Sequence, residues 1–156
     1  MKICVFSDSH GYEGNMTAAI GLEVPAMYFF LGDGERDFED VRRLFPDIPA
    51  IAVRGNCDFR SSLSISHTYE AGGIRIFATH GHMYNVKYER ELETLSAAAQ
   101  RAGADVALFG HTHRQYLSEK NGLLIVNPGS IGLGIYPCYA VLNIEGGKCR
   151  ADLKVL

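Results

Sequence analysis

Residues 48–58 read IPAIAVRGNCD, an apolar run that stops at Gly55 and continues into polar side chains. The apolar half predicts a short buried strand. The polar half has three interpretations. Cys57 could be a nucleophile, Asn56 or Asp58 could bind a ligand, or the segment could be a plain turn, since Gly, Asn and Asp are common in turns. The rest of the chain has to decide among them.

The same alternation of apolar runs and polar segments occurs throughout the first third of the chain. Apolar runs at 2–6, 26–31 and 48–53 predict buried strands, and segments 15–22 and 38–45 predict helices between them. Strand, helix, strand, helix and strand in this order are typical of a parallel sheet in an α/β fold.

The second half of the chain predicts one more helix and a further sheet. Gly72-Gly73 lies between two β-rich runs and indicates a hairpin. Residues 88–102 are rich in Glu, Leu, Ala and Gln and predict a helix, which Gly103 ends. A strand near 105–109 and three or four later strands complete the chain. We therefore expect one α/β domain over residues 1–156, with two facing mixed β-sheets flanked by helices.

Composition excludes several functional classes. The 156 residues carry a net charge of −3, so there is no broad basic surface for a nucleic-acid backbone. The four cysteines are widely spaced without a CxxC pair, which argues against a disulfide framework or a zinc cluster. The apolar run ICVF is too short for a signal-peptide core, and no stretch is long enough for a membrane span. We expect a cytoplasmic protein with no membrane partner, and the sequence leaves a homo-oligomer open.

Polar clusters follow the apolar runs at five places. The clusters are Asp8-Ser9-His10, Gly32-Asp33, Asn56-Cys57-Asp58, His80-Gly81-His82 and His111-Thr112-His113. Each alone has an ordinary explanation as a turn, a helix cap or a structural histidine. However, five of the six histidines lie in them. If the strands run parallel, all five clusters meet at the carboxyl edge of the sheet, where ligands bind. Alternation along a strand should put both rings of the last cluster on one side.

The residue types in these clusters indicate a metal centre. They offer two carboxylates, one amide oxygen and four imidazoles, namely Asp8, Asp33, Asn56, His10, His80, His111 and His113. Mixed imidazole and carboxylate sites suit manganese, iron or zinc better than calcium. Seven ligands are too many for one tetrahedral ion but suit two divalent ions. Two carboxylates cancel only half of their charge, and the surplus attracts a phosphate and acidifies bound water.

The order D-x-H, G-D, G-N-x-[DE], H, G-H-x-H resembles the calcineurin-like metallophosphoesterase superfamily, and GNCD is most similar to its small bacterial and archaeal phosphodiesterase branch. The resemblance runs from residue 3 to about residue 130. It implies a four-layer α/β sandwich with a dimetal site at the carboxyl ends of the strands. It also implies hydrolysis of a small phosphate ester by in-line attack of a metal-bridging hydroxide, and among phosphate esters it favours a phosphodiester.

The resemblance assigns a role to each matching position. One metal should be held by Asp8, His10 and His113, a second by Asn56, His80 and His111, with Asp33 bridging them. Manganese is favoured, with zinc, iron and nickel as the other candidates. Asp58 matches an acidic residue that orients a ligand or a general acid.

Position 57 departs from many superfamily members, which carry histidine there as the acid that protonates the leaving oxygen. A thiol is a weaker hydrogen bonder than imidazole, with an ordinary pKa of about 8.5. We interpret Cys57 as small packing filler at the rim of the site. His82, two residues beyond His80, is the candidate replacement acid, although a surface role is equally open to it.

Two other functions remain open. A phosphomonoesterase would use the same site. A non-catalytic protein-sorting subunit of the same superfamily would have a similar size, but such a subunit is expected to have lost some of the ligands that all seven positions keep here.

A glycine-rich segment after the last cluster, PGSIGLG at 128–134, resembles a phosphate-cradling loop. Phosphate-binding loops of the Rossmann and P-loop types are followed by a helix, but a strand is expected here, so we reject that interpretation. We interpret it as a turn that approaches the site closely.

Overall fold

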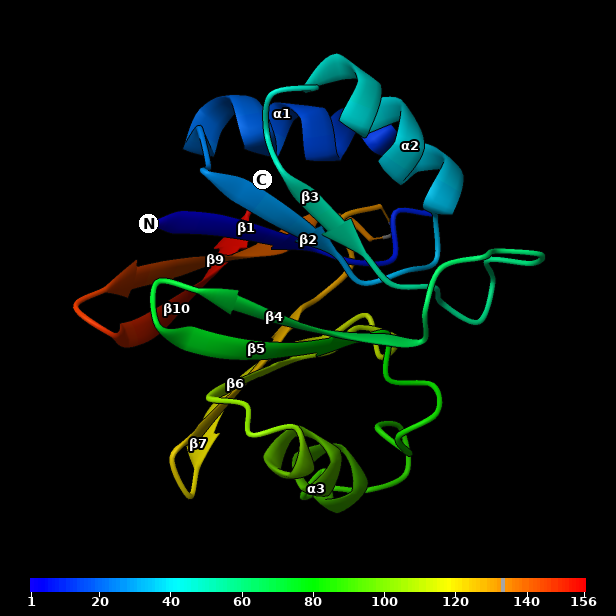
Figure 1. Ribbon diagram of the computed structural model, residues 1–156. Helices are drawn as coiled ribbons and strands as arrows, with labels where there is room; N and C mark the ends of the chain where they lie inside the picture. The colour runs from blue at the N-terminus through cyan, green and yellow to red at the C-terminus, as the bar shows by residue number, and fades with distance from the viewer. Residues whose placement is uncertain (133) are drawn as a thin grey trace.

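The computed structural model describes residues 1–132 and 134–156. The described residues form ten strands and three helices in two five-stranded sheets (Figure 1). The elements are β1 (Lys2–Phe6), α1 (Glu13–Glu23), β2 (Met27–Phe30), α2 (Glu35–Leu44), β3 (Ala50–Ala52), β4 (Ser66–Ala71), β5 (Ile74–Thr79), α3 (Glu93–Arg101), β6 (Val106–Leu108), β7 (Gln115–Lys120), β8 (Leu123–Pro128), β9 (Cys138–Glu145) and β10 (Lys148–Val155).

The first sheet has the strand order β10-β9-β1-β2-β3. Strands β1, β2 and β3 are parallel, and the hairpin β9-β10 pairs antiparallel with β1. Side chains alternate between two faces, as they must in a strand. Val5 and Phe29 belong to the core between the sheets, whereas Phe6 and Phe30 pack toward the helices α1 and α2. Both faces are therefore buried, which explains why β1 and β2 are continuous apolar runs.

The second sheet has the order β4-β5-β6-β8-β7, in which β5, β6 and β8 are parallel. Ile76 and Leu108 face the core between the sheets. Phe77 and Ile125 face the other way and pack with Leu95 of α3. Helices α1 and α2 thus cover one sheet and α3 covers the other (Figure 1). The predicted α/β architecture of two facing mixed sheets flanked by helices is confirmed.

The helix predicted at 88–102 is shorter than expected, because α3 begins only at Glu93. Leu92 has a φ of 52°, which interrupts a right-handed helix. The Glu89 side chain instead accepts hydrogen bonds from the backbone N–H and the hydroxyl of Thr94, so it caps the helix from outside. Among the described residues, no helix is long and apolar enough to cross a bilayer.

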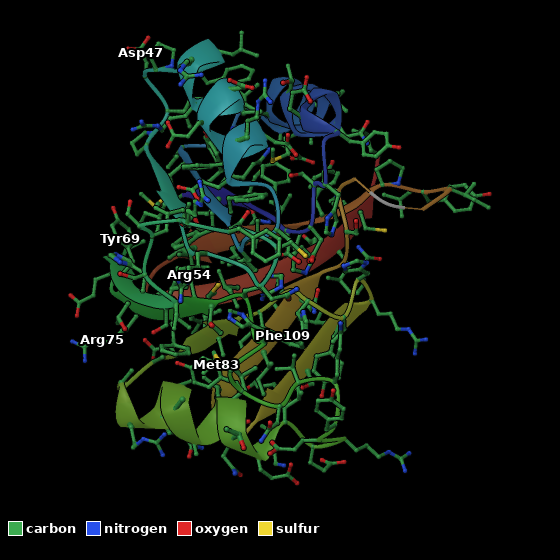
Figure 2. The ribbon with its side chains drawn as sticks, turned by 90° about the vertical axis from the view of Figure 1, so that its right-hand side faces the viewer. Asp47, Arg54, Tyr69, Arg75, Met83 and Phe109 are labelled. Atoms are coloured by element: carbon green, nitrogen blue, oxygen red, sulfur yellow. The ribbon has the colours of Figure 1, made fainter. Side chains whose placement is uncertain are left out.

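The carboxyl ends of both parallel sets point to one edge of the molecule. Hydrogen bonds join the sheets there: Leu31 of the first sheet accepts from Nδ1 of His80 in the second (2.8 Å), and the Asp8 carboxylate accepts from the N–H of His111 (3.1 Å). Figure 2 faces this edge, with Arg54, Met83 and Phe109 near its middle. The fold therefore brings loops from both sheets together.

Candidate metal centre

Asp8, His10 and His113 form the first group of potential ligands. Nε2 of His113 lies 3.1 Å from Oδ1 of Asp8, and Nε2 of His10 lies 3.9 Å from the same oxygen. One ligand atom from each of the three side chains lies within 4.8 Å of the other two. The loop after β1 and the loop after β6, a hundred residues apart, thus supply one cluster.

Asp33, His80 and His111 form the second group, with Asn56 beside it. Nε2 of His80 lies 3.4 Å from Oδ2 of Asp33, 3.2 Å from Nδ1 of His111 and 3.1 Å from Oδ1 of Asn56. The two groups adjoin, because the same nitrogen is 4.0 Å from Oδ1 of Asp8. All seven residues named by the sequence pattern therefore meet at this edge.

Asp33 is the residue that reaches both groups. Besides its contact with His80, its carboxylate belongs to a third set of neighbouring ligand atoms with His10 and Cys57. Its side chain is 3% exposed, so both oxygens are withdrawn from bulk water. A carboxylate in this position can contact two cations at once.

The donor atoms fit a bound cation. Oδ1 of Asp8 and Nε2 of His10 are buried and make no hydrogen bond with any residue that the structure describes. Nδ1 of His80 donates to the Leu31 carbonyl, so Nε2 of this ring faces Asp8 and Asp33 with either a proton or a lone pair for a cation. Carboxylate oxygens and imidazole nitrogens gathered in this way are costly unless a proton or a cation lies among them. The residues present therefore suit divalent metal ions.

The electrostatics of the second group agree with this interpretation. Burial opposes ionisation of Asp33, yet the hydrogen bond and charge of His80 hold the pKa of that carboxyl well below its usual range. Burial also disfavours the charged form of His80, but Asp33 and Asp8 raise the pKa of that imidazole. Burial and the neighbouring His80 charge lower the pKa of His111 to about 4. The carboxylates thus stabilise one positive charge among them.

Backbone conformation, rather than strand alternation, aims the histidines. Strand β6 ends at Leu108, and His111 and His113 follow in a loop with φ of 67° and 57°. The expectation that both rings project from one side of a strand is therefore wrong. Asp8, His10 and Asp33 also have positive φ, at 57°, 46° and 61°. Non-glycine residues rarely adopt this conformation, and such strain concentrates at functional sites.

Asp58 organises the loops around Asp33. Its carboxylate accepts four backbone N–H groups, those of Asp33 (2.8 Å), Gly34 (2.9 Å), Glu35 (2.9 Å) and Gly55 (2.7 Å). These bonds join the loop after β2 to the loop after β3. The geometry makes Asp58 a residue that positions Asp33.

Gly55 is required by close packing in the same place. A Cβ at this position would lie 2.0 Å from Oδ1 of Asp33 and 2.5 Å from its backbone nitrogen. The turn that ends the opening apolar run therefore lets Asp33 and Asn56 lie side by side.

Cys57 is exposed, so it does not fill space in the way that the sequence suggested. Its backbone N–H donates to Oδ1 of Asp33 (2.7 Å), and its sulfur accepts from the Asn56 amide (3.2 Å). Partial desolvation and the Asp33 carboxylate raise the pKa of Cys57 to about 11. A reactive thiolate is disfavoured there, which leaves the backbone N–H as its contribution to the site.

His82 lies at the rim of the second group. Its ring centroid is 5.4 Å from that of His80 and 6.2 Å from that of His111. Its Nδ1 is buried and makes no hydrogen bond with a described residue. Burial and the charge of His80 lower the pKa of this imidazole. His82 thus lies beside two of the candidate ligands.

Two supporting residues were missed by the sequence reasoning. Asp37 is buried in the first turn of α2 and accepts from the Ser9 hydroxyl (2.5 Å) and the Gly11 N–H (2.7 Å), which holds the first loop. Asn127 is buried at the end of β8 and donates to the Gly110 carbonyl (2.9 Å), which holds the loop before His111. Asn127 directly follows the apolar run LLIV, which was a signal in the sequence, whereas Asp37 lies in the charged segment ERDFED and had none.

The turn after β8 approaches the site as the sequence suggested. Ile131 donates its N–H to the Ser7 carbonyl (3.0 Å), and a Cβ on Gly132 would lie 1.7 Å from the carbonyl oxygen of Ser9. The part of this prediction that concerns Leu133 lies outside the described residues.

Comparisons with known proteins agree with the site. Residues 1–147 match the family model of the calcineurin-like phosphoesterase superfamily domain. A probable metallophosphoesterase of Bacillus subtilis is 31% identical over 148 residues, covering 93% of this chain and 85% of that protein. A phosphodiesterase of Methanocaldococcus jannaschii is 28% identical over 171 residues, covering 96% and 97%. The crystal structure of a predicted phosphoesterase from Streptococcus pneumoniae superimposes with a TM-score of 0.82 at 28% identity, covering 99% and 88%.

The fold is also shared with a protein-sorting subunit. Vps29 of Chaetomium thermophilum superimposes with a TM-score of 0.78, covering 100% of this chain and 95% of that one. Its identity is only 19%, so the likeness concerns the fold alone.

Proposed function

The chain belongs to the calcineurin-like phosphoesterase superfamily, and on that premise we propose that it is a phosphodiesterase that works with two divalent cations. The superfamily match and the phosphodiesterase among the relatives support a hydrolase. The observation that carries the proposal is the group of buried acceptors around Nε2 of His80 and Oδ1 of Asp8, which a cation pair would satisfy.

We assign the ligands according to the two clusters. Asp8, His10 and His113 would hold one cation, and Asn56, His80 and His111 would hold the other. Asp33 would contact both. When bound, the cations supply Lewis acidity and a water molecule of lowered pKa. The manganese ion is the favoured occupant, because oxygen and imidazole donors are mixed and no thiolate is required.

The protein itself contributes charge, orientation and a proton. Asp8 and Asp33 cancel only half of the charge of two divalent ions, so the centre would attract an anionic phosphate. Arg54, on the same edge in Figure 2, adds to this field. His82 is the proposed proton donor to the leaving oxygen, and Asp58 keeps Asp33 in place.

A small phosphate ester is the proposed substrate, and a diester is favoured over a monoester. Position 57 carries no imidazole, and the lowered pKa of His82 leaves little of its protonated form at neutral pH, so the reaction should favour esters whose leaving groups are themselves acidic. Rates on aryl phosphodiesters with leaving groups of graded pKa test this point. A flat dependence, with the chemical step rate-limiting, would contradict it.

The direct test is hydrolysis of bis-p-nitrophenyl phosphate and p-nitrophenyl phosphate by the purified protein, with and without Mn²⁺. We expect Mn²⁺-dependent turnover of both, faster on the diester. Faster hydrolysis of the monoester would indicate a phosphomonoesterase instead. Full metal occupancy without turnover of either ester would contradict the proposal and favour a binding role. Elemental analysis of the purified protein identifies the native metal.

A further inference from the structure

An open cavity of about 560 Å³ adjoins the candidate metal centre. It lies between the segment that precedes α3 and the loop that carries His111 and His113. Thr112, between these two histidines, and Arg114, directly after them, both contribute to its wall. We propose that this cavity binds the second alcohol of the substrate, a flat ring-containing group with an additional anion. The inference rests on the proposed phosphodiesterase function and specifies its substrate class.

The floor of the cavity is apolar and aromatic. Val86, Leu92 and Phe109 are buried beneath it, and Tyr116 is half-buried at the start of β7. The rings of Phe109 and Tyr116 meet at a centroid distance of 6.0 Å and an angle of 62°. Tyr116 keeps part of its ring accessible and can stack on a flat ring, whereas Phe109 is 2% exposed and supports Tyr116 from beneath.

The rim of the cavity is cationic. Lys87, Arg90 and Arg114 line it, and none of them forms an ion pair with a residue that the structure describes. The acidic lining residue, Glu89, already accepts three hydrogen bonds, from the hydroxyl and backbone N–H of Thr94 and from Asn85. Glu89 keeps its negative charge, so three cations and one carboxylate leave the lining with a net charge of +2. In a chain with a net charge of −3, this local excess of positive charge indicates an anionic ligand.

The size of the cavity suits an organic group that is larger than a lone phosphate. Pockets for small organic ligands span about 300–1,000 Å³, and this cavity falls within that range. With the reacting phosphate at the metal centre, the neighbouring cavity is placed to take the second alcohol to which that phosphate is attached. An apolar floor under a cationic rim fits a ring bearing a second phosphate or carboxylate.

The test uses three esters with the same leaving group, p-nitrophenolate, and different second alcohols. These are methyl p-nitrophenyl phosphate, p-nitrophenyl thymidine 5′-phosphate, and the latter compound with a 3′-phosphate. We expect kcat/KM of the Mn²⁺-loaded protein to rise in this order. Arg90→Ala should reduce the ratio of kcat/KM for the third ester to kcat/KM for the first about tenfold, the typical effect of one charge-assisted contact. Arg101→Ala, an exposed cation on α3 outside the cavity, should leave that ratio unchanged.

A binding measurement separates this inference from the proposed function. Calorimetric titration of the Mn²⁺-loaded protein with thymidine 3′,5′-bisphosphate should show binding that Arg90→Ala weakens about tenfold and Arg101→Ala does not. If no ester is hydrolysed but the bisphosphate binds and only Arg90→Ala weakens its binding, the proposed function is wrong and the proposed ligand site is supported. Equal ester ratios, or equal binding, in the wild type and Arg90→Ala would overturn the cavity proposal even if all three esters are hydrolysed.

Discussion

Replacing Asp58 with asparagine removes one charge and almost no volume, so it isolates the role of this side chain. Oδ2 accepts from the N–H groups of Asp33 and Gly55, and Oδ1 accepts from those of Gly34 and Glu35. Asparagine has one oxygen and one NH₂ group. In either orientation, two of the four N–H donors would face another donor.

The expected cost follows from those two lost bonds. A hydrogen bond to a charged group contributes about 1.5–3 kcal/mol. We take the lower value because these bonds are only partly buried, which gives roughly 3 kcal/mol for two bonds. For a chain of 156 residues, each kcal/mol corresponds to about 2–4 °C in Tm. The Tm of Asp58→Asn should therefore fall by about 6–12 °C.

The assay is thermal unfolding of the metal-free protein, followed by calorimetric titration with Mn²⁺. Because Asp58 positions Asp33, the affinity for Mn²⁺ should also fall by about tenfold or more, as for other residues that orient a ligand. The control is Asp47→Asn, the same change on an exposed residue at the periphery of the view in Figure 2, away from Arg54 and Phe109. A Tm of Asp58→Asn within about 2 °C of that control, with unchanged Mn²⁺ affinity, would refute the reasoning.

Three other substitutions probe the same centre. Asp33→Asn should abolish Mn²⁺ binding and hydrolysis together, measured by elemental analysis and a diester assay; activity at the wild-type level would contradict its bridging role. Gly55→Ala should weaken Mn²⁺ binding at least tenfold, because its Cβ would displace Asp33, whereas Gly14→Ala, which meets no atom within 4 Å, should bind normally. Cys57→His should flatten the dependence of kcat on leaving-group pKa by supplying an acid, and an unchanged slope would show that position 57 does not face the leaving oxygen.

The fold was predictable wherever apolar periodicity and turn residues agree. Apolar runs such as residues 2–6 and 26–31 are too short for a typical helix and end in turn residues, which favours a strand. The start of α3 was not predictable, because residues 88–92 have a helical composition but Leu92 has a φ of 52°. That conformation depends on how Glu89 contacts Thr94, which local composition does not encode.

The candidate ligands were recognisable because their types recur after successive strands, and the fold brings all of these residues to one edge. The way in which they are aimed was not recognisable. Side-chain direction at His111 and His113 comes from left-handed backbone conformations held by long-range bonds such as that from Asn127 to Gly110. The cavity beside them was equally hidden, since it is formed by segments whose residues share no sequence pattern.

The most direct measurement is an anomalous difference map from a crystal of this protein soaked in Mn²⁺. The account predicts two peaks, one among Asp8, His10 and His113 and one among Asn56, His80 and His111, both within coordination distance of Asp33. Absence of ions from this edge, with the seven side chains satisfied by one another or by water, would contradict it.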